Sequence, residues 1–225
     1  MKLEKLIQLA GEKVLLSQEY GMNKDWENYN LALQEATSLY QQIIKEDSGN
    51  CFHYSNLGFA YYELGEFEKA LENIKTAIKL APEDAEVKSN FYLHKGIAEQ
   101  DLNKLEEAKL SYTKSSEFKE NTEALRRRSL IYFSEASDHV QTDATQSVKS
   151  LCQAIDDICQ AIGIDRRNDE ESKENYVLLS QLVKSLFSIS GDKRDQELAE
   201  KAREWELKVP EMKRELIKIY APKDD

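Results

Sequence analysis

The sequence predicts an all-α fold in which antiparallel helix hairpins stack on one another. The helical periodicity of apolar residues runs through nearly all of the 225 residues. Only 8 Gly and 3 Pro interrupt this pattern, too few for the many tight turns of an all-β sandwich or barrel. Hydrophobic residues make up 40% of the chain, which is enough for a packed core and argues against a disordered acidic chain.

Short runs of Gly, Asn, Asp and Pro mark where the predicted helices end. The segments between these runs are roughly 14 to 22 residues long, within the usual range for helices. We therefore expect about eleven helices, and the short connections imply antiparallel hairpins. The breaks lie at residues 21–23, 47–50, 65–66, 81–84, 103, 141–143, 163–169, 190–192 and 210.

Residues 51–84 contain the pattern that indicates the type of hairpin. Its first half has aromatic, Leu-Gly and aromatic positions, and its second half has regularly spaced Ala and aliphatic residues before a proline. The positions are Tyr54, Leu57, Gly58, Tyr61, Leu64, Gly65, Phe67, Ala70, Ile74, Ala77, Leu80 and Pro82. The pattern resembles the tetratricopeptide repeat, a 34-residue unit of two helices. The resemblance implies a right-handed α-solenoid with irregular end units.

Further copies of the pattern follow and precede this unit. The second copy begins from Gly96 and continues through Leu102, Leu105, Ala108, Tyr112, Ser115 and Phe118. Lys95, Glu99 and Glu120 stand where Leu, Tyr and Pro are expected. The second-helix pattern alone recurs at Leu33, Ala36, Tyr40 and Ile43, and at Leu151, Ala154, Ile158, Ala161 and Ile164. We expect the partner helices, about 2–20 and 122–140, to be longer and joined by longer loops.

These units predict one helical domain over residues 1–225. An irregular N-terminal hairpin (1–50) precedes two clear repeats (51–84 and 85–120), a divergent repeat (121–168), and a degenerate hairpin with a capping helix (169–225). Within a hairpin, small residues such as Gly58 and Ala70 let the two helices approach closely. Larger residues then fill the space between neighbouring hairpins, since no hairpin buries its apolar face alone.

Nothing in the sequence indicates catalysis, a metal or a cofactor. The chain has no Gly-rich phosphate loop, G-x-S-x-G, H-E-x-x-H or paired C-x-x-C motif. His53, His94 and His139 are scattered, and we expect each to lie at the surface or partly packed. Asp156-Asp157 reads as a solvated helix face. Cys152 and Cys159 share one helical face, and we expect them to be buried as small hydrophobic residues. We predict that the chain is not an enzyme.

Charge and targeting signals narrow the partners and the compartment. The formal charge of −11 argues against a nucleic-acid binder, and no run of about 18 apolar residues predicts a membrane span. The N-terminus begins with Lys2 and Lys5, but polar residues interrupt its apolar stretch, so it reads as an amphipathic helix and not as a secretory signal. An odd number of cysteines, 3, makes no disulfide framework, so we expect a cytoplasmic protein.

The resemblance also implies where a partner would bind. In this family the first helix of each hairpin lines the inner face of the solenoid, so the expected groove is formed by first-helix residues. These are Phe52, Ser55, Asn56, Phe59, Tyr62, Asn90, Leu93, His94, Ile97, Arg126 and Arg127. Exposed aromatic residues such as Phe52, Phe59 and Tyr62 can anchor a bound peptide; alternatively they contact the long neighbouring helices.

The run Arg126-Arg127-Arg128 is the most basic stretch of the chain and also has two interpretations. Two of its side chains could each meet a carboxylate or phosphate through paired hydrogen bonds. Alternatively, the arginines form ion pairs with the nearby Glu117, Glu120 or Glu123. Some family members clamp the C-terminal carboxylate of heat-shock chaperones with two Asn, two Lys and one Arg. Here Asn56 and Arg127 match, whereas Phe52, His94 and Glu123 replace Lys, Asn and Lys.

The sequence favours a non-enzymatic, co-chaperone-like adaptor that binds a peptide or helix of an unidentified partner protein in the groove. The alternative is a self-associating structural or regulatory subunit, a monomer or weak homodimer that uses helices around Trp26 and Trp205 for homotypic contacts. A third hypothesis, a phosphate or nucleic-acid contact through Arg126 to Arg128, conflicts with the net charge except as a local feature.

Overall fold

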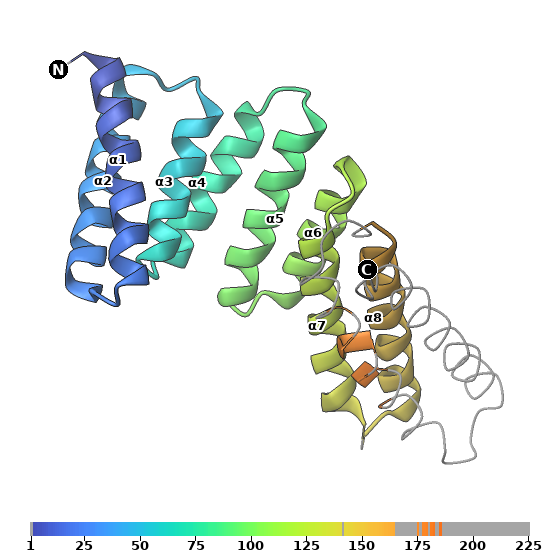
Figure 1. Cartoon of the computed structure of the whole chain (residues 1–225). Coiled ribbons are helices and arrows are strands. Elements are labelled where there is room, and N and C mark those ends of the chain that lie inside the picture. The colour runs from blue at the N-terminus through green and yellow to red at the C-terminus, as the bar shows by residue number, and fades with distance from the viewer. Residues whose placement is uncertain are drawn as a thin grey trace, which may run out of the picture. The chain divides into compact units, whose positions relative to one another are not determined.

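The computed structural model describes residues 2–140 and 142–164, together with residues 175, 177–179, 181, 182 and 185. Every element of regular structure in these residues is a helix (Figure 1). The helices are α1 (Leu3–Met22), α2 (Trp26–Glu46), α3 (Cys51–Glu63), α4 (Phe67–Leu80), α5 (Ala85–Asp101), α6 (Leu105–Phe118), α7 (Thr122–His139) and α8 (Ala144–Ile164). The all-α prediction is confirmed. The expected degenerate hairpin and capping helix at 169–225, which include Trp205, lie largely outside the described residues.

The chain divides into two compact units, residues 1–119 and 120–225. The first unit contains three antiparallel hairpins, α1–α2, α3–α4 and α5–α6, in which α2 packs against α3 and α4 packs against α5. The described part of the second unit contains the hairpin α7–α8. The expectation of one continuous domain stays a prediction.

Each hairpin of the first unit turns in the same way. After the first helix, one residue adopts a left-handed backbone conformation: Lys24 (φ 58°), Gly65 (φ 75°) and Asn103 (φ 56°). The amide of the next residue then donates to a carbonyl five residues back, as Glu66 N–H does to the Tyr61 carbonyl. This arrangement is the Schellman motif, which satisfies carbonyls at a helix end. Only the middle hairpin uses glycine, the residue that adopts this conformation without strain.

The first hairpin differs from the second in helix length and not in its loop. Helices α1 and α2 have 20 and 21 residues, against 13 and 14 for α3 and α4, so each is seven residues longer. Seven residues is about two helical turns, so the extra length leaves the same faces inward. The expectation of a longer loop is wrong here, because three residues connect the helices in both hairpins.

Small residues bring the paired helices together, as predicted. A Cβ atom added at Gly58 would lie 2.9 Å from Ile74 Cγ1 and 3.2 Å from the Ala70 carbonyl oxygen. At Gly96 it would lie 2.6 Å from the ring of Tyr112, which is fully buried. These separations are shorter than a carbon–carbon contact allows. The close approach of α3 to α4 and of α5 to α6 therefore requires glycine at these two positions.

The predicted second-helix residues form the cores of the two units. In the first unit Ala36, Tyr40, Ile43 and Ala70 share a buried cluster with Leu6, Ala10, Leu57 and Tyr61. In the second unit Leu151, Ala154 and Ile158 are buried with Ala136 and Val148. Cys152 and Cys159 are partly buried beside this cluster, so the predicted burial is reached only in part.

Candidate functional site

Nine of the predicted groove residues lie on α3 and α5, and none of them is buried. We call this set the first-helix face: Phe52, Ser55, Asn56, Phe59, Tyr62, Asn90, Leu93, His94 and Ile97. Phe52 is the most exposed aromatic residue among them, at 50%. Other faces of the same two helices are buried in the stack, for example at Leu57 and Phe91. The assignment of these nine residues to a binding groove stays a prediction.

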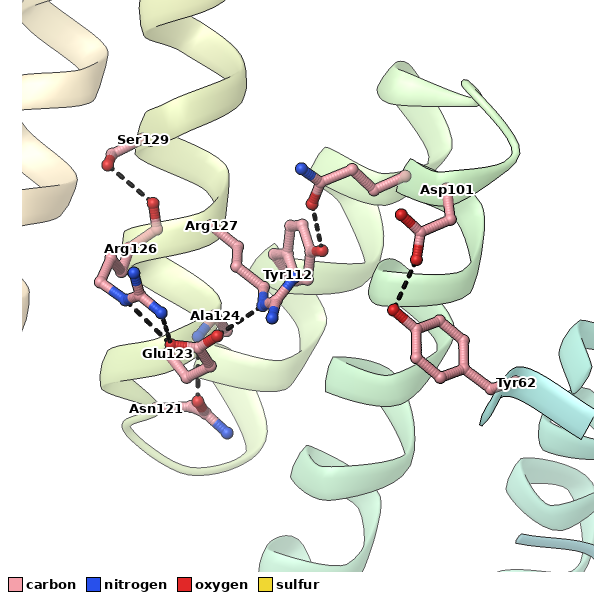
Figure 2. Close-up of polar contacts among 10 residues, drawn as sticks. Tyr62, Asp101, Tyr112, Asn121, Glu123, Ala124, Arg126, Arg127 and Ser129 are labelled. Carbon is pink, nitrogen blue, oxygen red and sulfur yellow. Dashed lines mark hydrogen bonds and ion pairs between the residues drawn. The ribbon is translucent and has the colours of Figure 1, made fainter. Parts of the chain in front are cut away.

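Direct contacts between α3 and α5 bring the two parts of the first-helix face together. The Tyr62 hydroxyl donates a hydrogen bond of 2.6 Å to Asp101 Oδ2 at the end of α5 (Figure 2). The rings of Phe52 and Phe91 meet edge to face with centroids 6.0 Å apart. Tyr62 and Phe52 therefore contact a neighbouring helix while keeping exposed surface, and their role as anchors for a peptide stays a prediction.

Two tyrosines of α2, Tyr29 and Tyr40, form hydrogen bonds with residues of α3. Tyr40 is buried, and its burial raises the pKa of the hydroxyl, partly offset by a hydrogen bond with Asn56. Burial raises the pKa of Tyr29 more strongly, and its hydrogen bond to Glu63 and the charge of that carboxylate act in the same direction. Asn56 and Glu63 on α3 are thus partly occupied by contacts within the fold.

The arginine run lies on α7 in the second unit, and carboxylates engage all three side chains. Arg126 donates from Nε (2.9 Å) and Nη2 (2.6 Å) to Glu123 Oε2, and Arg127 donates to the other oxygen of Glu123 (Figure 2). This confirms the pairing with Glu123 that the sequence offered as an alternative. Arg128 instead binds Asp157 on α8, with contacts of 2.8 and 2.6 Å.

The ion pair of Arg128 with Asp157 corrects one expectation. Asp157 is only 6% exposed and is not on a solvated helix face, although its neighbour Asp156 is exposed. Arg128 and Asp157 are 29 residues apart in sequence, so no helical spacing signalled the contact. The pair ties α7 to α8 and supports a structural role for Arg128.

One of the three histidines also departs from expectation. His53 is buried, 5% exposed, with Nε2 3.0 Å from Asp47 Oδ2, whereas His94 and His139 are exposed. Among the described residues, no group of three or more His, Cys, Asp or Glu side chains could hold a metal ion. No described helix is both long and apolar enough to cross a membrane.

Sequence reasoning missed a set of exposed apolar residues on α1. Ile7, Leu15 and Met22 are exposed at 38%, 66% and 79%, and their spacing places them within one sector of the helix. The sequence signal for these residues was the helical spacing of apolar side chains between positions 7 and 22.

Comparison with known proteins identifies the repeat. Residues 53–84 match the family model described as tetratricopeptide repeat. Over 96% of this chain and 97% of the other, the fold is similar to the crystal structure of the MamA protein, with a TM-score of 0.58 and 16% sequence identity. Residues 53–84 of this chain are thus a tetratricopeptide repeat.

Two other solved structures are also similar to this chain. The match to the crystal structure of BtubC from P. vanneervenii covers 100% of this chain and 96% of BtubC, with a TM-score of 0.51 and 16% sequence identity. A further match is the first tetratricopeptide domain of Spaghetti (RPAP3), which was solved bound to an HSP90 peptide of sequence SRMEEVD. The match covers 58% of this chain and 94% of that domain, with 26% sequence identity. Its TM-score is 0.44, and at that value the likeness says nothing about what this chain binds.

Proposed function

We propose that this chain is a non-enzymatic adaptor that binds a peptide or helix of a partner protein on the first-helix face. The observation that carries the proposal is the contrast between this face and the rest of α3 and α5. Core positions such as Leu57 and Phe91 are closed by the neighbouring helices, whereas all nine residues of the face keep exposed surface. Exposed rings beside uncharged polar groups suit the recognition of a peptide.

The family supports the same function by analogy. Tetratricopeptide repeats commonly mediate association between proteins, although a fold by itself does not determine a function. A stack of hairpins offers an extended surface made of many helices, which suits a partner that lies across several of them. The face carries aromatic anchors, Phe52 and Phe59, and exposed amide groups on Asn56 and Asn90.

The test is substitution of the two phenylalanines by alanine. We expect the variant Phe52→Ala/Phe59→Ala to lose capture of partner proteins from a lysate of the source organism, measured by mass spectrometry of the retained proteins. Tyr62 is left in place because its hydroxyl joins α3 to α5. Leu110→Ala is the matched control, since Leu110 is 65% exposed on α6, a second helix. Unchanged capture by a folded double variant would remove the face from consideration.

A second candidate function, self-association, is favoured by a separate observation. Met22 and Trp26 flank the turn between α1 and α2 and are 79% and 59% exposed, a large apolar area for one turn. Such a patch suits contact between two copies. Light scattering over a range of concentrations tests it: a mass that rises with concentration, and that Trp26→Ser returns to the monomer value, supports self-association. A monomer at every concentration excludes it.

A further inference from the structure

Helix α6 differs from the second helices of the other two hairpins in the first unit, because polar side chains hold it to its partner. Two of its four buried residues are serines, and the set is Ala108, Ser111, Tyr112 and Ser115. The four buried residues of α4 are all apolar: Ala70, Leu71, Ile74 and Ala77. The one buried hydroxyl residue of similar size in α2, Thr37, donates to the Leu33 carbonyl within its own helix. The hairpin α5–α6 thus depends on hydrogen bonds where its neighbours depend on apolar packing.

The polar contacts between α5 and α6 match particular groups on the two helices. The Ser115 hydroxyl donates to the Ser89 carbonyl at 2.9 Å, and the two serine hydroxyls lie 3.2 Å apart. The Ser111 hydroxyl donates to Glu99 Oε2 at 2.6 Å, and Glu99 is buried. A segment that took the place of α6 without these hydroxyl groups would leave buried oxygen atoms of α5 without donors, which costs free energy. The α6 of a second copy is a segment that satisfies them.

The turn between α5 and α6 is short and strained. It consists of three residues, Leu102, Asn103 and Lys104. Asn103 has a φ angle of 56°, a left-handed conformation that costs free energy for a residue with a Cβ atom. None of the three residues is glycine or proline, so the chain can also continue through them as a helix. A helix through the turn would release the strain and separate α6 from α5.

Neither of the other two hairpins of the first unit combines a polar interface with a strained turn. The turn of α3–α4 uses Gly65, which adopts its φ of 75° without strain. The turn of α1–α2 is strained at Lys24, but its helices share an apolar cluster that includes Leu6, Ala10 and Tyr40. Exposing apolar surface to water costs more than exposing polar groups that regain hydrogen bonds with water. Of these three hairpins, α5–α6 is therefore the one that opens at the lowest cost.

We propose that α6 is exchanged between two copies of the chain. In each copy α5 and α6 form one continuous helix through residues 102–104, and each α6 packs on the α5 of the other copy. The contacts of Ser115 with Ser89 and of Ser111 with Glu99 then form between chains instead of within one. This domain swap keeps the interface of the monomer and removes the strain at both turns, so the dimer is favoured as the protein concentration rises. This route to self-association is separate from the patch at Met22 and Trp26, and it does not depend on the adaptor function.

The first test changes the residue at the turn of the full chain. Light scattering, after refolding from urea over a range of concentrations, gives the dissociation constant of the dimer. Asn103→Ala should lower this constant by about tenfold or more, because alanine strains the turn further, favours the continuous helix, and acts at both turns of the dimer. Asn103→Gly should raise it by about tenfold or more, since glycine relieves the turn and weakens the helix. Lys24→Ala makes the same change in a hairpin with an apolar interface and should leave the constant unaltered.

The second test locates the contact within the dimer. The variant Ser89→Cys/Ser115→Cys places two thiols where the serine hydroxyls lie 3.2 Å apart, and the two single variants control for bonds to the native cysteines. After oxidation and size-exclusion chromatography, a non-reducing gel should show the two chains of the dimer fraction joined and those of the monomer fraction closed internally.

Two results would overturn the exchange of α6. Dimers whose chains separate on the gel would assign the association to another surface, such as the one that Trp26→Ser removes. A monomer at every concentration for Asn103→Ala would show that the turn does not open into a helix. Both results leave the adaptor function to its own test with the phenylalanine variants.

Discussion

A buried polar cluster in the hairpin α5–α6 occupies two positions where the preceding repeat has apolar side chains. Lys95 and Glu99 stand where α3 has Leu57 and Tyr61, and the Lys95 ammonium lies 2.6 Å from Glu99 Oε1. The Ser111 hydroxyl donates to Glu99 Oε2 at 2.6 Å and lies 2.7 Å from the same ammonium. Glu99 is only 3% exposed, so the cluster is part of the core.

We predict that Glu99→Ala lowers the free energy of unfolding by about 2–3 kcal/mol. Removing one partner of a fully buried ion pair costs roughly 3–5 kcal/mol, because it leaves the other charge without compensation. The side chain of Lys95 is 20% exposed and can reach water in part, which places the expected cost below that range. Urea unfolding followed by circular dichroism measures the change, and hydrogen exchange locates it in α5 and α6.

The matched control replaces the whole cluster. Lys95→Met/Glu99→Leu/Ser111→Ala keeps similar volumes and leaves no charge behind, so we expect its stability to lie within about 1 kcal/mol of the unaltered chain or above it. If the triple variant were as unstable as Glu99→Ala, the cluster would be a net source of stability. If Glu99→Ala cost less than about 0.5 kcal/mol, the carboxylate would not be compensating a buried charge, and the reasoning would be refuted.

Three further predictions concern single positions in the first unit. Gly96→Ala should destabilise it by about 1–3 kcal/mol in urea unfolding, since the new methyl group would overlap the buried ring of Tyr112; a smaller loss would show that the ring can move. Lys24→Gly should stabilise it by about 0.5–1 kcal/mol, because φ is 58° there, and no gain would argue against that conformation. The raised pKa of Tyr29 means that its protonated form favours folding. That contribution is complete below the ordinary pKa of 10.0 and is lost as pH rises above it, so Tyr29→Phe should reduce the fall in stability above pH 10, and an unchanged alkaline titration would contradict the assignment.

The sequence alone determined the helical class, the hairpins and the repeat at residues 51–84. These features depend on local signals, because apolar spacing, capping residues and small residues act over a few turns of one helix. Gly58 and Ala70 predicted a close approach that the structure contains. Asn50 and Asp84 each cap the helix that follows, as their positions at the predicted breaks imply, and Asn121, which lies at no predicted break, caps α7.

Only the tertiary structure decided how distant residues pair and which faces remain open. The ion pair of Arg128 with Asp157 and the contact of Tyr62 with Asp101 join residues 29 and 39 positions apart, beyond the reach of any helical period. Seven additional residues in each helix of the first hairpin obscured the place of α1 in the repeat. Because side-chain periodicity describes one helix at a time, exposure at Leu15 and open space at Gly11 emerged only once neighbouring helices were in place.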